Sequence, residues 1–177
     1  MRCFIAIDLP NEIKEEIVKI QKQLPEAKQK LVEKENLHLT LVFLDEIDDY
    51  KINQIKNSLK EITFDKFQAS LGKIGIFPSE SFIRVVWVSM EPSQTIKQLH
   101  DEIFEKIKNI GKFDKRFESH ITIARVKYIQ DKENFIKKLK QISINPIKFS
   151  VNEFAIKKSS LTRQGPIYED IIKFELK

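Results

Sequence analysis

The apolar residues of this chain follow two periodicities, one typical of buried strands and one typical of amphipathic helices. Residues 2–8 form a short apolar run, and residues 38–44 alternate between polar and apolar side chains, so both segments predict strands. Between them, Pro10 precedes apolar residues at helical spacing from Ile13 to Leu24, as expected of a helix that begins near a proline. The N-terminal part therefore predicts a strand, a helix and a second strand.

The same order of elements returns later in the chain. Residues 82–90 are rich in β-branched and aromatic side chains, and Pro92 opens a helical pattern that continues to Ile107. Gly111 then ends this helix, and residues 120–127 form the matching strand. The second part repeats the first.

An offset of 82 positions aligns identical residues in the two parts, which indicates an internal duplication. A duplication of this kind places equivalent residues on either side of a pseudo-twofold axis. The aligned pairs are Arg2 with Arg84, Pro10 with Pro92, His38 with His120, and Thr40 with Thr122.

The remaining elements complete an α+β fold. No Pro-, Gly- or Ser-rich linker interrupts residues 1–177, so we expect a single compact domain made of two pseudo-symmetric lobes. The further elements that the patterns predict are helices over residues 49–62 and 131–142 and strands over residues 67–77, 147–157 and 167–175, with the strand over 67–77 ending at Pro78.

Two of the three histidines begin the same four-residue motif, HLTL at residues 38–41 and HITI at residues 120–123. Side chains alternate along a strand, so the histidine and the threonine of each motif share one face, about 6.5 to 7 Å apart. The aliphatic residues point to the core. If the pseudo-twofold axis brings the motifs together, one cleft contains two imidazoles and two hydroxyls.

That set of side chains suits chemistry at a phosphodiester. In-line displacement at phosphorus needs a base and an acid on opposite sides, and histidine titrates near pH 7. Threonine hydroxyls donate hydrogen bonds to the non-bridging oxygens, which carry negative charge. The alternatives are a polar pair at a strand end without function and a zinc site, although threonine is a poor zinc ligand and no third ligand recurs with either motif.

Composition adds weaker constraints. The net charge of +5 suits a polyanionic partner, but the lysines also suit a solvated surface. Cys3, the one cysteine, lies in an apolar strand pattern, which predicts that it is a small buried hydrophobic residue. The first apolar run is too short for a signal peptide, so we expect a cytoplasmic protein, and we expect His100 to be a surface residue without function.

Five segments together resemble the 2H phosphoesterase superfamily, and within it the branch of RNA 2',3'-cyclic phosphodiesterases, also called 2'-5' RNA ligase-like. The resemblance spans nearly the whole chain, in the family's order. The segments are RCFIAID at residues 2–8, NLHLTL at 36–41, GIFP at 75–78, HITIARV at 120–126 and GPIY at 165–168.

The resemblance implies a bilobal fold in which two antiparallel β-sheets face each other across a central groove, with helices outside. It implies metal-independent hydrolysis of RNA 2',3'-cyclic phosphate ends to 2'-phosphate ends, with reversible, ATP-independent 2'-5' ligation as a related activity. His38 is then the proton donor and His120 the proton acceptor, while Thr40 and Thr122 hold the phosphoryl oxygens.

The chain departs from the family pattern at three positions. Relatives often have lysine and glycine where Val42 and Asp45 stand, and proline where Ser119 precedes the second motif. The lysine is a possible phosphate contact, so its absence bears on substrate affinity more than on the chemistry.

Three further residues are candidates for substrate binding. Arg125 suits a phosphate, but strict alternation from His120 turns it to the opposite face unless the strand twists or bulges. Arg84, repeated at Arg2, is a candidate for the rim of the groove, with surface ion pairing as its alternative. Phe77 is a candidate for stacking on a terminal base, with core packing as its alternative.

Two rival functions stay open from the sequence. One is a non-catalytic RNA- or nucleotide-binding module that keeps the histidines as contacts, and the other is a phosphodiesterase that acts on a small cyclic nucleotide. For the leading hypothesis we expect RNA with 2',3'-cyclic phosphate ends as the partner, no metal or cofactor, no membrane, no obligatory protein partner, and a monomer.

Overall fold

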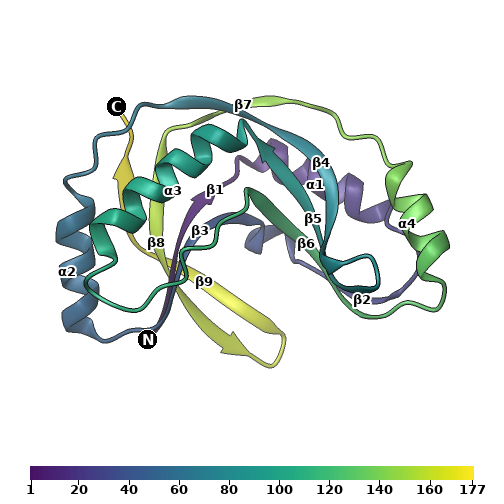
Figure 1. Cartoon of the computed structure of the whole chain (residues 1–177), viewed down its shortest axis with the longest axis horizontal. Coiled ribbons are helices and arrows are strands. Elements are labelled where there is room, and N and C mark those ends of the chain that lie inside the picture. Colours follow the sequence, from purple (N-terminus) through teal and green to yellow (C-terminus); the bar gives the residue numbers. More distant parts are fainter.

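The computed structural model describes residues 1–177 as an α+β fold in which two antiparallel β-sheets are accompanied by four α-helices (Figure 1). The first sheet has the strand order β3-β1-β8-β9, and the second has the order β2-β6-β5-β4-β7. The predicted fold class is confirmed. The strands are β1 (Arg2–Asp8), β2 (Lys28–Leu31), β3 (His38–Glu46), β4 (Phe67–Ser79), β5 (Phe82–Glu91), β6 (His120–Tyr128), β7 (Lys148–Val151), β8 (Glu153–Thr162) and β9 (Gly165–Glu175).

The helices begin where the sequence supplies a start signal. The side chains of Asp48 and Asp131 accept hydrogen bonds from the backbone N–H groups of Lys51 and Asn134, which caps α2 and α4. Prolines precede the other two helices, and each helix buries its apolar face. The helices are α1 (Asn11–Lys22), α2 (Asp49–Leu59), α3 (Ser93–Ile107) and α4 (Lys132–Lys140), with one 3₁₀ turn, η1 (Lys34–Asn36).

The duplicated order is visible in the elements, because β1-α1-β3-α2 is repeated as β5-α3-β6-α4. Each repeat places its first strand beside its second, β1 against β3 and β5 against β6. The two halves also exchange strands. Strand β2 of the first half pairs with β6 of the second sheet, while the C-terminal hairpin β8–β9 completes the first sheet and projects from the body in Figure 1.

Three details differ from the sequence-based expectation. The strand predicted over residues 147–157 is divided at Asn152 into β7 and β8, which belong to different sheets. Strand β4 continues through Pro78 to Ser79, with an irregular register against β5 at that point. Strand β2 was missed because its sequence, KQKL, has no strand-like apolar pattern and three of its four side chains are exposed.

Residue Asp45 explains one departure from the family pattern. Its φ angle is +52°, in the left-handed region that glycine adopts without steric cost and aspartate tolerates better than most residues. The glycine that the resemblance implies at this position fits this backbone conformation, and aspartate is one of the few acceptable replacements.

Two buried polar side chains hold strand β6 in place. Gln21 on α1 donates hydrogen bonds from Nε2 to the carbonyl oxygens of Val32 and Ile123, both at 2.9 Å, and so links the first lobe to β6. Ser119 donates from Oγ to the carbonyl oxygen of Met90 at 2.6 Å, which joins the start of β6 to the end of β5. The strand that carries the second motif is thus held at Ser119, just before it begins, and at Ile123 within it.

The prediction that His100 lies at the surface is wrong. Its side chain is 1% exposed and stacks against Phe117, with ring centroids 4.5 Å apart, and against Phe104. The position of His100 in the helical pattern did not show that the segment leading into β6, which contains Phe117, covers the face of α3 on which His100 lies. No helix of the structure has both the length and the apolar character needed to cross a membrane.

Candidate active site

Strands β3 and β6 carry the two motifs and share one burial pattern. The histidine and threonine of each motif are half-buried, while the residues between and after them are buried. Each strand then has two consecutive buried residues, Leu41 and Val42 in β3 and Ile123 and Ala124 in β6. These doublets mark places where strict alternation fails.

A register shift explains each doublet. Ile5 and Ala6 of β1 pair with Val42 and Thr40, so Leu41 is an extra residue in β3. In the same way, Val86 and Trp87 of β5 pair with Ala124 and Thr122, which leaves Ile123 extra in β6. An extra residue reverses the faces of all later side chains.

The bulges turn Phe43 and Arg125 onto the face of the histidines. Both residues are exposed, and both line the same cavity as His38 and His120. The sequence left open whether Arg125 faces the groove, and the bulge at Ile123 places it there.

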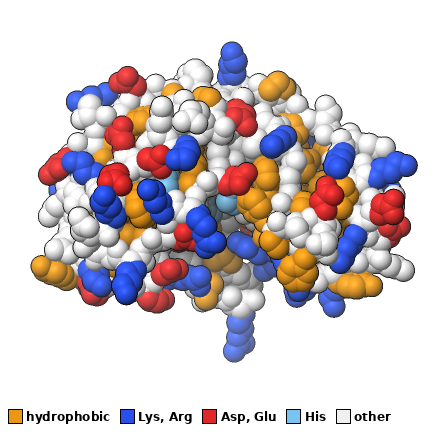
Figure 2. Space-filling model, viewed as in Figure 1, with side chains coloured by type: hydrophobic (Ala, Val, Ile, Leu, Met, Phe, Trp, Pro, Cys, Tyr) orange, Lys and Arg blue, Asp and Glu red, His pale blue; other side chains and the backbone are white.

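A single cavity of about 870 Å³ contains both motifs, and its walls come from both lobes and from the β8–β9 hairpin. This volume lies near the upper end of the usual range for ligand pockets, about 300–1,000 Å³. Figure 2 shows a hollow near the centre of one face, with histidine inside it and Lys and Arg around it. Its lining includes the four motif residues His38, Thr40, His120 and Thr122, together with Arg125 and Arg2.

Backbone carbonyl groups orient both imidazoles. Nδ1 of His38 lies 2.7 Å from the carbonyl oxygen of Asn36, and Nδ1 of His120 lies 2.7 Å from that of Glu118. A carbonyl oxygen only accepts, so Nδ1 carries the proton in both rings and Nε2 is left for chemistry. Nε2 of His38 is 2.9 Å from Oγ1 of Thr40.

Burial and nearby charges shift the titration of both histidines. Burial lowers the pKa of His38 to about 4, with Lys157 acting in the same direction and the Asn36 carbonyl opposing it. Burial also lowers the pKa of His120, against the opposing effect of the Glu118 carbonyl. Both rings are therefore neutral at pH 7 in the ligand-free protein, and a bound phosphate anion favours protonation of one of them.

The two other candidate substrate-binding residues lie outside the cavity lining. Arg84 donates from Nη1 to the carbonyl oxygen of Lys127 at 3.1 Å, and its guanidinium lies 4.4 Å from the ring centre of Phe82. Phe77 packs against Trp87 and His120, with ring centroids 5.0 Å apart in both cases. Arg84 is thus a surface residue that makes no ion pair, and Phe77 is half-buried against the rings of Trp87 and His120.

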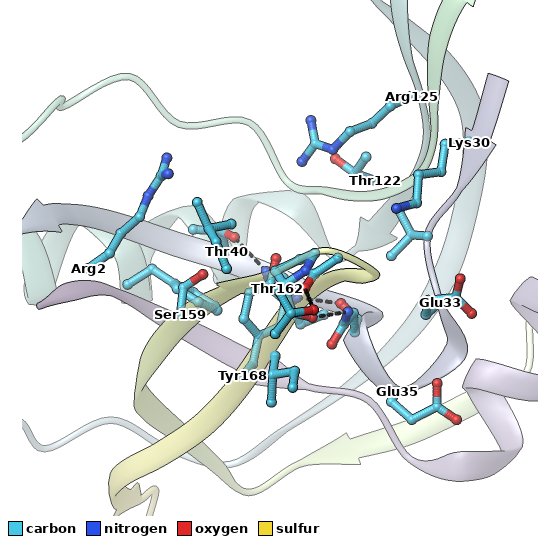
Figure 3. Close-up of a pocket in the computed structure, with 18 of the residues that line it drawn as sticks. Arg2, Lys30, Glu33, Glu35, Thr40, Thr122, Arg125, Ser159, Thr162 and Tyr168 are labelled. Carbon is cyan, nitrogen blue, oxygen red and sulfur yellow. Dashed lines mark hydrogen bonds between the residues drawn. The ribbon is translucent and has the colours of Figure 1, made fainter. Parts of the chain in front are cut away.

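Three lining residues were not singled out from the sequence, Phe43, Tyr168 and Lys30, whereas Arg2 was named there as the counterpart of Arg84. Figure 3 shows Arg2 and Tyr168 on one side of the cavity and Lys30, Thr122 and Arg125 on the other. For Phe43 the sequence did contain a signal, because Phe43 follows His38 by the same interval as Arg125 follows His120. This spacing could have indicated that the two residues occupy corresponding positions. No three His, Cys, Asp or Glu side chains are grouped so that they could hold a metal ion.

The family model described as LigT like Phosphoesterase matches the chain twice, over residues 7–87 and 88–168. These matches span most of the chain and divide it where the internal duplication does. The chain belongs to the LigT-like phosphoesterase family. The 2H phosphoesterase resemblance drawn from the sequence is thereby confirmed.

Curated relatives of this LigT-like protein have a consistent activity in their names. RNA 2',3'-cyclic phosphodiesterase from Methanocaldococcus jannaschii is 40% identical over 97% of this chain and 98% of its own. The protein of the same name from Archaeoglobus fulgidus is 36% identical over 99% of this chain and 100% of its own.

Solved structures share the fold of this LigT-like protein. A Thermus thermophilus protein has a TM-score of 0.84 and 26% identity, with 99% of this chain and 97% of that chain covered. LigT of E. coli in complex with 3'-AMP has a TM-score of 0.81 and 29% identity, with coverage of 99% and 97%.

Proposed function

We propose that this protein hydrolyses RNA 2',3'-cyclic phosphate ends to 2'-phosphate ends, with His38 as proton donor and His120 as proton acceptor. The observation that carries the proposal is the convergence of two motifs in one cavity, each with Nδ1 of its histidine bound to a backbone carbonyl, so that Nε2 is the nitrogen that can exchange a proton. The names of the relatives point to the same substrate.

The two histidines act on opposite sides of phosphorus. Neutral His120 takes a proton from water through Nε2 as the water oxygen forms its bond to phosphorus. The bond from phosphorus to O3' breaks, and Nε2 of protonated His38 gives its proton to O3'. The hydroxyls of Thr40 and Thr122 donate to the non-bridging oxygens.

Substrate charge assists this division of roles. The pKa of His38 is about 4 in the ligand-free protein, so His38 is not a proton donor at pH 7 until an anion lies beside it. The phosphate supplies that anion. Arg125 and Arg2, which line the cavity and make no salt bridge, provide further positive charge for phosphate groups.

The same site supports ligation. When the 5'-hydroxyl of a second RNA replaces water, His120 removes its proton, the new bond to phosphorus forms, and O3' leaves with the proton of His38. The 2'-oxygen stays bonded to phosphorus, so the product carries a 2'-5' linkage and no ATP is consumed. The reverse reaction cleaves that linkage.

Base stacking is assigned to Phe43 instead of Phe77. Phe43 is 59% exposed and lines the cavity, whereas Phe77 packs against His120 and Trp87. An exposed aromatic ring stacks on any base, which suits binding that tolerates different RNA sequences.

The deciding experiment incubates the purified protein, with EDTA and without ATP, with a short RNA that ends in a 2',3'-cyclic phosphate. We expect a 2'-phosphate end, and His38→Ala and His120→Ala should each slow its formation by about 10² to 10⁴. Thermal unfolding should remain cooperative in both variants. His100→Gln is the control variant, because His100 does not line the cavity. The folded molecules of this variant should keep the activity of the wild type.

Other outcomes separate the rival functions. Binding of the RNA without any product, weakened by both alanine variants, would identify a binding module. Turnover of a 2',3'-cyclic mononucleotide at a much higher kcat/KM than of the RNA would identify a small cyclic nucleotide as the substrate.

A further inference from the structure

The histidine of each motif meets an aromatic ring at nearly a right angle. The ring of Tyr168 meets that of His38 with centroids 5.2 Å apart and an interplanar angle of 89°. The ring of Phe77 meets that of His120 at 5.0 Å and 87°. The two contacts have nearly the same geometry, but only the one at His38 brings a hydroxyl group to the site.

The Tyr168 hydroxyl has no partner within the protein. None of the hydrogen bonds of the chain involves it, and it is not among the buried atoms that lack a partner. Tyr168 lines the cavity, so its hydroxyl is open to whatever the cavity binds. Contacts with His38 and with Phe4, at a centroid distance of 4.9 Å, hold the ring in place.

Burial keeps the phenol of Tyr168 protonated, so that it stays a hydrogen-bond donor. Burial raises the pKa of the phenol, and the positive charges of Arg125 and Arg2 act against this rise. The phenol is therefore neutral at pH 7, with its proton available. Figure 3 shows Arg2 and Arg125 on opposite sides of the cavity that Tyr168 lines.

We propose that Tyr168 is a further catalytic residue, whose hydroxyl donates a hydrogen bond to a non-bridging oxygen of the cyclic phosphate on the His38 side. This inference rests on the proposed function. It names a third hydroxyl donor beside the two threonines and assigns it to the side of the leaving O3'.

The hydrogen bond between His38 and Thr40 is the reason that the phosphoryl oxygen on the His38 side needs another hydrogen-bond donor. As His38 loses its proton to O3', its Nε2 becomes an acceptor for the Thr40 hydroxyl, which lies 2.9 Å away. The Thr40 proton is then shared between the imidazole and the phosphoryl oxygen. The Tyr168 hydroxyl has no competing acceptor, so it holds the phosphoryl oxygen throughout the step.

The first test is Tyr168→Phe, which removes the hydroxyl and keeps the ring. The variant then resembles the other motif, where the phenylalanine Phe77 packs against His120. Loss of one donor to a developing charge should lower kcat by about 10- to 100-fold with little change in KM. Tyr128→Phe is the matched control, because Tyr128 is 62% exposed and does not line the cavity. Its kcat should equal that of the wild type.

The pH dependence separates donation to phosphate from an effect on His38. If the hydroxyl contacts the phosphoryl group, Tyr168→Phe lowers the whole pH–rate profile and leaves its midpoints in place. A shift of the midpoints at unchanged maximal rate would overturn the proposal, because the tyrosine would then act through the imidazole.

The sharpest test uses the Rp and Sp diastereomers of a 2',3'-cyclic phosphorothioate, in which sulfur replaces one non-bridging oxygen. Sulfur is a weak acceptor, so Tyr168→Phe should cost less than about 3-fold with the diastereomer whose sulfur faces Tyr168. The full 10- to 100-fold cost should remain with the other diastereomer and with the oxygen substrate. Equal costs with all three would also overturn the inference.

The wild-type reaction distinguishes failure of the inference from failure of the proposed function. If the wild type turns over the cyclic RNA and Tyr168→Phe does so equally well, the inference alone is wrong. If the wild type forms no product, the proposed function is wrong. Titration with a nucleoside 2'-monophosphate then decides whether Tyr168 contacts phosphate, since equal affinity of Tyr168→Phe and Tyr128→Phe would exclude that contact.

Discussion

Phe43 and Arg125 lie at corresponding positions of the two lobes, each turned into the cavity by the bulge that follows its His-x-Thr motif. A phosphate held between the two motifs therefore has an aromatic ring on one side and a guanidinium on the other. In the proposed reaction His38 acts on O3' of the nucleoside, which places the base on the Phe43 side. Arg125 is then left to phosphate groups.

Phe43→Ala should weaken binding of the RNA end. A base stacked on an aromatic ring contributes about 1 to 3 kcal/mol, so we expect KM to rise about 5- to 150-fold with a smaller effect on kcat. Phe43→Trp should retain affinity. Phe82→Ala is the control, since Phe82 is also exposed but lies outside the cavity lining, and an equal rise in KM there would contradict the assignment.

Arg125→Met should reduce affinity for RNA and make that affinity less sensitive to salt. The guanidinium releases counterions when it contacts phosphate, so its removal should lower the slope of log affinity against log salt by about 1. Arg84→Met is the comparison, because Arg84 is bound to the Lys127 carbonyl and does not line the cavity. Equal slopes in the two variants would argue against phosphate contact by Arg125.

His38 should make the protein less stable in acid. Its pKa is about 4 when folded, below the value of about 6.5 in an unfolded chain, so the unfolded state binds more protons below pH 6.5. Stability from this residue is complete above pH 6.5 and falls as the pH drops toward 4, by about 2 kcal/mol at pH 5. Urea unfolding of the wild type and His38→Asn at pH 8 and pH 5 measures this, and the variant should lose less stability between the two.

Gly75→Ala should destabilise the fold beside the second motif. An added Cβ would lie 2.1 Å from Cζ2 of Trp87, and Trp87 contacts His120. Overpacking of this kind costs about 1–3 kcal/mol and displaces the indole. Thermal unfolding should show the loss, and Trp87→Phe in the same chain should recover part of it because the clashing atoms are removed. Additive losses in the double variant would contradict the clash.

The α+β content, the duplicated order of elements and the four motif residues could be read from the amino-acid sequence, because periodicity and side-chain alternation are local properties of the chain. His38 and Thr40 face the same way on any regular strand. The resemblance of five segments to one family then predicted that the two motifs share one groove. The structure has both motifs in one cavity.

The remaining features depended on pairing between strands that are distant in the sequence. Bulges at Leu41 and Ile123 appear only in the registers of β1 with β3 and of β5 with β6. The bulge at Ile123 decides which face Arg125 takes, which the sequence left open. Tyr168 reaches His38 because the last strands of the chain complete the first sheet. Strand order and register are set by the packing of the whole core, so only the tertiary structure decided which side chains surround the two histidines.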